Sequence, residues 1–212
     1  MRICLINASP RAKGSTSEML SGYLLPMLEG HQVTRLHVAG VTEELPEQLR
    51  GCDALVLLFP LYADSFPSHV VRLLEQLYAA DPGANVRFYA VINNGFYEGK
   101  QCEVAVRQLR LFARAAGLVW GQAICVGAGE LHRSLQGIPL GKGPNKNLGR
   151  ALARLAKNIL QCTDDADVYT QPNCPRTIWR WLARTFMWNA KAKENGLSKK
   201  DLYRRIGDSN DD

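Results

Sequence analysis

Hydrophobic residues recur along this chain in five runs of strand length, separated by stretches with helical spacing. The runs are rich in Val, Ile, Leu and aromatic side chains and cover residues 2–6, 33–38, 54–60, 86–93 and 120–126. A strand that is apolar at nearly every position is buried on both faces. The pattern therefore predicts a parallel sheet with helices packed on both sides.

The stretches between the runs place their apolar residues on one helical face. In the first two helices we expect Met19, Tyr23 and Leu24, and then Val70, Leu73, Leu74 and Leu77, to face the core. In the third helix, which ends at Gly117, the core-facing positions are Val104, Leu109, Phe112 and Ala116. In the fourth, over residues 147–161, they are Leu148, Ala151, Leu152, Leu155 and Ile159. Five strand–helix units are too few for a (β/α)8 barrel. We predict an α/β fold with a doubly wound five-stranded parallel sheet over residues 1–162 and a C-terminal helical extension over residues 163–212.

The loop after the first run has the composition of an anion site. Ser9, Pro10 and Arg11 are followed by Gly14 and then by Ser15, Thr16 and Ser17, which open a helix. Hydroxyl and N–H donors gathered at a helix N-terminus favour a phosphate. The spacing fits neither a Walker A loop nor a three-glycine dinucleotide loop. An ordinary helix cap formed by these hydroxyls is the alternative.

Three further loops should meet the first one, since the carboxyl ends of parallel strands share one edge of a sheet. One of them is the loop after the fifth run, which reads Gly127-Ala128-Gly129-Glu130. The loop after the third run contains Pro60, Leu61, Tyr62 and Ala63, which form an apolar, aromatic wall. The loop after the fourth run reads Asn93-Asn94-Gly95-Phe96 and offers amide donors and acceptors, and Gly95 permits a positive φ. Together the loops predict a site for a phosphorylated planar heterocycle.

These motifs resemble those of the flavodoxin-like NAD(P)H-dependent FMN reductases and the quinone or azo-compound reductases. The likeness covers about residues 1–130 and rests on the Ser9-Pro10-Arg11 loop, the Pro60-Leu61-Tyr62 turn and the Asn93-Asn94-Gly95-Phe96 turn. It implies an enzyme that takes hydride from NADH or NADPH and reduces a quinone, an azo compound or free flavin. The alternatives are a flavodoxin-type electron carrier and a flavodoxin-like binding module without activity.

The resemblance also assigns residues to the cofactor but assigns no catalytic side chain. It implies that the FMN phosphate is bound by Ser9, Arg11, Ser15, Thr16 and Ser17, and that the isoalloxazine ring is bordered by Pro60, Leu61, Tyr62, Ala63, Asn93, Asn94, Gly95 and Phe96.

Composition narrows the class of protein further. The chain carries a formal net charge of +6 and has a pI near 9.1, which suits an anionic small ligand and speaks against the acidic surface typical of an electron carrier. No helix concentrates Lys and Arg around reading side chains, so we expect no nucleic-acid partner. The sequence lacks an apolar span of membrane length and a signal pattern, which predicts a cytoplasmic protein. The six cysteines are scattered, so we expect no metal site.

Two segments lie outside the resemblance. Residues 127–146 are rich in Gly and Pro, and a lid over the flavin, a solvated loop and a disordered segment are the open interpretations. Within this segment His132 is expected to be solvated, with proton donation to a substrate as the alternative.

The second segment is the tail, residues 175–190, which contains Trp179, Trp181, Phe186 and Trp188. We expect this apolar face to be covered by intramolecular packing or by a subunit interface in a homodimer. A membrane-surface helix and a wall of the substrate pocket are the less favoured interpretations.

Overall fold

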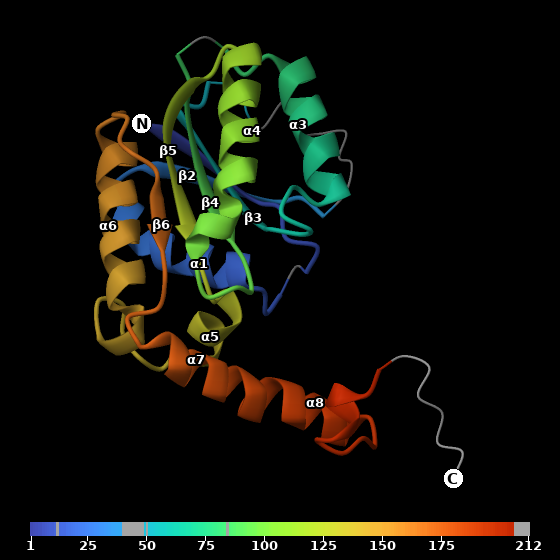
Figure 1. Ribbon diagram of the computed structural model, residues 1–212. Helices are drawn as coiled ribbons and strands as arrows, with labels where there is room; N and C mark the ends of the chain where they lie inside the picture. Colours follow the sequence, from blue (N-terminus) through green and yellow to red (C-terminus); the bar gives the residue numbers. More distant parts are fainter. Residues whose placement is uncertain (12, 40–48, 50, 84, 206–212) are drawn as a thin grey trace. The chain divides into compact units, whose positions relative to one another are not determined.

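The computed structural model describes residues 1–11, 13–39, 49, 51–83 and 85–205. The chain divides into two compact units, Met1–Asn173 and Cys174–Asp212. The first unit is an α/β domain, and the second is built around one helix (Figure 1).

A parallel sheet runs through the first unit. Its strands are β1 (Arg2–Asn7), β2 (Gln32–His37), β3 (Ala54–Pro60), β4 (Arg87–Asn93), β5 (Val119–Val126) and β6 (Val168–Thr170). Their order in the sheet is β2-β1-β3-β4-β5-β6. The predicted α/β, doubly wound parallel fold is confirmed, and the ends of the first five strands differ from the prediction by no more than one residue.

The sheet has six described strands, whereas five were predicted. Strand β6 pairs in parallel with β5 through only three residues. It lies in the first unit, although the sequence prediction assigned residues 163–173 to the extension. The Asp167 carboxylate precedes β6 and accepts hydrogen bonds from the Trp120 indole N–H at 3.3 Å and the Ala123 backbone N–H at 2.9 Å. A strand this short has no periodicity to detect, and tertiary contacts such as these hold it in place.

Helices cover both faces of the sheet. Their bounds are α1 (Thr16–Leu24), η1 (Leu25–Leu28), α3 (Ser68–Ala80), η2 (Gly99–Cys102), α4 (Glu103–Ala115), α5 (Gly129–Ser134), η3 (Gly143–Asn145) and α6 (Lys146–Leu160). Helices α3 and α4 lie on one face, and α1 and α6 lie on the other (Figure 1).

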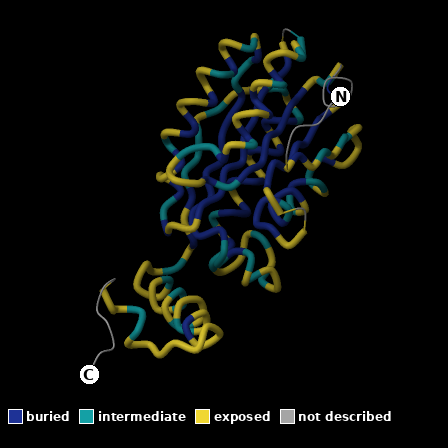
Figure 2. The backbone as a smooth tube through the Cα atoms, turned by 90° about the vertical axis from the view of Figure 1, so that its right-hand side faces the viewer, coloured by how far each residue is buried: buried dark blue, intermediate teal, exposed yellow. Residues whose placement is uncertain are grey.

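Each face of the sheet has its own hydrophobic core, and the central strands β1, β3, β4 and β5 are largely buried between them (Figure 2). The prediction of strands buried on both faces is wrong for β2, which lies at an edge of the sheet and has no buried residue. The predicted apolar faces of α3 and α6 are buried throughout. In α4 the prediction is wrong for Val104, which is 51% exposed. The helix instead turns Ala105 and Val106 towards the sheet, so its buried face begins one residue later than expected.

The strand order creates a switch point between β1 and β3. The chain leaves β1 towards one edge of the sheet through β2, and it continues from β3 towards the opposite edge. Crevices at the carboxyl ends of strands beside such a point are where doubly wound folds bind ligands. The fold therefore places the Ser9 loop, the Tyr62 loop and the Asn93 loop at one edge, as the sequence predicts.

The second unit contains a helix that is continuous from residue 176 to residue 194. It consists of α7 (Arg176–Leu182), a π-helical stretch η4 (Ala183–Trp188) and α8 (Asn189–Glu194), followed by a short turn η5 (Asp201–Tyr203). The backbone N–H of Leu197 donates to the Ala192 carbonyl at 2.8 Å, and Ala192 is buried. The second unit does not itself cover the aromatic face of this helix, because within it Trp181 is 59% exposed and Phe186 is 66% exposed.

Candidate functional site

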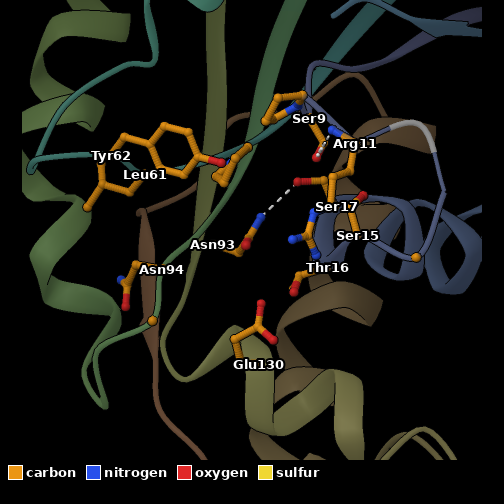
Figure 3. A pocket seen from close by; sticks show the side chains of 14 residues that line it. Ser9, Arg11, Ser15, Thr16, Ser17, Leu61, Tyr62, Asn93, Asn94 and Glu130 are labelled. Carbon is orange, nitrogen blue, oxygen red and sulfur yellow. Dashed lines mark hydrogen bonds between the residues drawn. The ribbon is translucent and has the colours of Figure 1, made fainter. Parts of the chain in front are cut away.

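A cavity of about 240 Å³ opens at the carboxyl ends of β1, β3 and β4 (Figure 3). Eleven of the thirteen residues assigned to the cofactor by resemblance line it: Ser9, Arg11, Ser15, Thr16, Ser17, Pro60, Leu61, Tyr62, Asn93, Asn94 and Gly95. Pro10, Gly14 and Glu130 also line it. Residues from segments more than 80 positions apart in sequence thus meet in one cavity, as the sequence predicts.

The loop after β1 is fixed by short-range hydrogen bonds. The Asn7 side-chain oxygen accepts from the Ser9 backbone N–H at 3.1 Å, and the Ser9 hydroxyl oxygen accepts from the Arg11 N–H at 3.3 Å. Such side-chain turns hold a short polar loop in one conformation. Figure 3 shows the Arg11 side chain reaching into the cavity beside Thr16 and Ser17, which places a permanent positive charge there.

Helix α1 begins at this loop, and Ser15 is its N-cap. The Ser15 hydroxyl oxygen accepts from the Glu18 N–H at 3.1 Å, so the capping interpretation is confirmed for this residue. The first backbone N–H groups of a helix have no partner within the helix. The Ser15 hydroxyl accepts only from Glu18, so the N–H groups of Thr16 and Ser17 stay available. These groups and the helix dipole favour an anion at this end of the cavity.

Asn93 joins two walls of the cavity. Its amide donates to the Ser17 hydroxyl at 2.8 Å and to the Phe59 carbonyl at 3.2 Å, and the residue is only 6% exposed. The bond to Ser17 ties the end of β4 to the first turn of α1 (Figure 3). Asn93 therefore sets the width of the cavity between the two elements.

Asn94 presents an unsatisfied acceptor. Its amide nitrogen donates to the Glu98 carbonyl at 3.3 Å and to the Cys102 sulfur at 3.2 Å, which fixes the orientation of the amide. Its side-chain oxygen is buried and has no hydrogen-bond partner among the described residues. An orphaned buried acceptor costs about 1–3 kcal/mol.

The apolar wall comes from the loop after β3. Tyr62 and Ser65 pair across a two-residue turn, in which Ala63 and Asp64 have φ values of 46° and 60°. This turn holds Leu61 and Tyr62 at the cavity, and Tyr62 remains 52% exposed. Ala63, within the turn, is not part of the lining.

The loop after β4 differs from the expectation in two details. Gly95 does not adopt a positive φ, and a Cβ added to it would meet no atom within 4 Å, so its backbone does not require glycine. Gly95 lines the cavity, so the open space beside it is space on the cavity side. Phe96 is 54% exposed and does not line the cavity.

Helix α5 contributes to a further side of the cavity. The sequence predicts that the loop after β5 reaches the site, but it does not predict a helix there. Glu130 on α5 lines the cavity and is paired with Arg133. Arg133 also donates to the Gly14 carbonyl at 2.9 Å, so it anchors the loop after β1. Packing is tight here, because a Cβ on Gly129 would lie 3.0 Å from the Thr16 methyl group. Residues 129–134 are thus a folded wall of the cavity and not a solvated loop.

His132, in the same helix, is buried, which contradicts the expected solvated histidine. It is 1% exposed, and its Nδ1 lies 2.8 Å from the Asn145 side-chain oxygen. The Asn145 amide nitrogen donates to the Leu135 and Ile138 carbonyls, so its oxygen accepts and His132 Nδ1 donates. Burial lowers the pKa of His132 below its ordinary value of 6.5. His132 thus holds α5 to the segment before α6 in its neutral form.

Two histidines that the sequence did not single out support the first loop from outside the cavity. Nε2 of His37, at the end of β2, lies 2.9 Å from the Ser9 carbonyl oxygen. Nε2 of His69, in α3, lies 2.9 Å from the Ala8 carbonyl oxygen. A carbonyl accepts, so each Nε2 donates. Their contacts join elements far apart in sequence, and no local motif indicates them.

The described residues contain no cluster of three or more His, Cys, Asp or Glu side chains placed to hold a metal ion. Nor does this part of the chain contain a helix that is both long enough and apolar enough to cross a membrane.

The sheet order and the position of the cavity define a flavodoxin-like α/β protein. Solved structures with this fold confirm the class. An NADH:FMN oxidoreductase in its apo form matches with a TM-score of 0.60 at 15% identity, over 77% of this chain and 90% of that one. A flavodoxin from Streptococcus pneumoniae TIGR4 matches with a TM-score of 0.57 at 12% identity, over 77% of this chain and all of that one.

A third solved structure, an NADPH-quinone reductase from P. pentosaceus, matches with a TM-score of 0.53 at 15% identity, over 74% of this chain and 96% of that one. No family model matches this chain, and no curated protein matches it. At these identities the likeness establishes the flavodoxin-like fold, and the function has to be argued from the site.

Proposed function

We propose that this protein is an FMN-dependent oxidoreductase, which takes hydride from NADH or NADPH and passes electrons to a small acceptor such as a quinone, an azo compound or free flavin. The observation that carries the proposal is the cavity itself. It combines a cation and free helix N–H groups at one end with an apolar wall at the other.

The two ends of the cavity suit the two ends of FMN. Ser9, Arg11 and the N–H groups of Thr16 and Ser17 would hold the phosphate, because they supply hydrogen bonds and positive potential at the helix N-terminus. Asn93, Asn94 and Gly95 would border the ring. Leu61 and Tyr62 would lie along the ring.

The volume of the cavity refines this assignment. Pockets that enclose a drug-sized ligand have volumes of about 300–1,000 Å³. A cavity of about 240 Å³ is smaller, so we place the phosphate-bearing end of FMN inside it and the ring at its open side. Tyr62 lines the cavity and is more than half exposed, so it is available to a ring or to a substrate.

The flavin, when bound, supplies the hydride chemistry, and the protein supplies binding, orientation and electrostatics. In this proposal the residues of the cavity anchor the phosphate and present hydrogen-bond partners to the ring edge. No side chain has to act as an acid or a base. The solved structures that share this fold include oxidoreductases as well as flavodoxins, so the fold is compatible with the proposed reaction.

The test is to reconstitute the purified protein with FMN and to mix it anaerobically with NADH and with NADPH. We expect one of the two to bleach the visible absorbance of the flavin, and a quinone to restore it. A protein that binds FMN but is reduced by neither nucleotide would be an electron carrier. A protein that binds no flavin would be a binding module of another kind, and either result would overturn the proposed function.

A further inference from the structure

The C-terminal unit exposes an unusual amount of apolar surface. No residue of α7 or of the π-helical stretch η4 is buried. Within this unit the large apolar side chains with exposures of 44–68% are Ile178, Trp181, Phe186, Met187, Trp188, Leu197 and Tyr203. Contiguous apolar surface of this kind marks an interaction site.

The same unit carries most of the excess positive charge of the protein. Residues 174–212 contain nine Lys and Arg and five Asp and Glu, a net charge of +4 of the +6 for the whole chain. Both acidic residues among the described part of the unit already have cationic partners, since Glu194 pairs with Lys191 at 2.7 Å and Asp201 pairs with Arg204 at 3.4 Å. The surface is therefore both apolar and strongly cationic.

A hollow beside the helix brings the two properties together. It has a volume of about 660 Å³, and its lining includes Trp179, Trp181, Trp188 and Tyr203 together with Arg180 and Arg184. The Arg184 guanidinium lies 5.8 Å from the centre of the Tyr203 ring. Indole and phenol rings prefer the headgroup level of a bilayer, and guanidinium groups bind phosphate.

The positive charge and the exposed apolar side chains of this surface distinguish between its possible binding partners. A second copy of the chain would bring the same positive charge against itself, which is repulsive. A nucleic acid would meet the cations but would leave the exposed Ile178, Phe186 and Met187 without apolar contacts. An anionic lipid surface satisfies both, because apolar side chains enter the headgroup region while Arg and Lys remain at the phosphates.

We propose that the C-terminal unit docks this protein on an anionic phospholipid surface, with helix 176–194 lying in the plane of the headgroups. The sequence alone favours packing of the aromatic face within the protein or at a subunit interface. Within the C-terminal unit Trp181 and Phe186 are exposed, so this unit offers the face to a partner. This proposal does not depend on flavin binding, because the contact with the lipid surface involves only the C-terminal unit.

The test is sedimentation of the full chain with vesicles of phosphatidylglycerol and phosphatidylcholine, and with vesicles of phosphatidylcholine alone. We expect binding to the anionic vesicles only, and weaker binding as salt is added, because screening reduces the attraction. Each cation at such a surface contributes roughly a fivefold gain in partitioning, so Arg180→Gln with Arg184→Gln should weaken binding about 25-fold. Trp181→Ser with Trp188→Ser should weaken it about tenfold or more.

Matched controls come from the first unit. Tyr78 and Leu111 are exposed to a similar degree, 59% and 68%, so Tyr78→Ser with Leu111→Ser controls for the loss of exposed apolar surface. Arg72→Gln with Arg114→Gln controls for the loss of two positive charges. Both control variants should bind vesicles like the unmodified protein, and thermal unfolding should show that all four variants are folded.

Several results would overturn the proposal. The full chain could fail to sediment with anionic vesicles at low salt, or the tail variants could bind as the controls do. A lipid-free dimer that Trp181→Ser with Trp188→Ser dissociates would show a subunit interface instead. The unmodified chain could also bind duplex DNA but not vesicles. If the arginine variant then lost DNA binding, the surface would be a nucleic-acid surface.

Discussion

Arg11 brings a permanent positive charge into the cavity at the point where helix α1 begins. A charge-assisted hydrogen bond contributes roughly 1.5–3 kcal/mol, so Arg11→Ala should weaken FMN binding about ten- to a hundredfold. Lys13 is the matched control, since it is an exposed cation of the same loop that does not line the cavity. Fluorescence titration of both variants measures the effect, and equal losses for Lys13→Ala and Arg11→Ala would mean that only the general charge of the loop matters.

Gly95 allows a test of ligand approach without backbone strain. A side chain at this position meets nothing within 4 Å and needs no positive φ, so Gly95→Val should leave the thermal midpoint nearly unchanged. Because Gly95 lines the cavity, the added methyl groups should obstruct the ring and weaken FMN binding about tenfold or more.

The control for this change is Gly137→Val, at another glycine with open space around it and no positive φ. If Gly95→Val binds FMN as tightly as Gly137→Val does, the loop after β4 does not border the ligand.

At the scale of elements, helix α5 tunes the charge of the cavity through Glu130 and Arg133. Glu130→Gln removes a charge that repels phosphate, and FMN affinity should rise by up to about fivefold for this partly exposed group. Arg133→Gln leaves the carboxylate uncompensated and frees the Gly14 carbonyl, so affinity should fall.

Riboflavin carries no phosphate, and its affinity should change little in either of these variants. The Glu103→Gln and Arg107→Gln changes on α4 break a comparable ion pair away from the cavity and serve as controls. Equal responses of FMN and riboflavin would contradict an electrostatic role for α5 at the phosphate.

The buried His132 on α5 should make the free energy of unfolding depend on pH. Because its pKa is lowered in the folded state, the unfolded chain takes up a proton first as the pH falls through about 6.5. Proton uptake by the unfolded chain reduces the free energy of unfolding below that pH. Urea unfolding across this range should show the decrease in the free energy of unfolding. The His132→Asn variant retains a donor for Asn145, and its free energy of unfolding should decrease less. His31→Asn, at an exposed histidine, is the control, and an identical pH dependence in both variants would assign the loss to other groups.

The strands and the main helices were predictable from the sequence because each has a long apolar pattern of its own. Strand β6 was not, since three residues carry no period and its position depends on Asp167 contacts that cross the sheet. Helix α5 was missed for a related reason: it has six residues, begins among glycines and is fixed by Arg133 and His132 through tertiary hydrogen bonds.

The cavity was predictable to a similar extent. Loops that follow parallel strands must meet at one edge, so Ser9, Tyr62 and Asn93 could be placed together before their contacts were known. Glu130 could be placed there as well, because it follows the fifth strand. The contributions of His37 and His69 could not, because each depends on a neighbour far away in sequence. The left-handed turn at Ala63 and Asp64 was also missed, since neither residue is a glycine or an asparagine.

For the molecule as a whole, the two units differ in character. The first has two hydrophobic cores and a polar cavity at one edge of its sheet. The second is an exposed helix with much of the positive charge of the chain. The two proposals accordingly place ligand binding in the first unit and surface recognition in the second.

The most direct test of the central claim compares FMN with riboflavin, which differ only in the phosphate. We expect FMN to bind at least about a hundredfold more tightly, because the phosphate meets Arg11, Ser9 and the N-terminus of α1, and two such charge-assisted contacts contribute roughly 3 kcal/mol or more. A fluorescence-quenching titration of the purified protein with each flavin measures both dissociation constants. Comparable affinities for the two flavins, or no binding of FMN, would contradict the account.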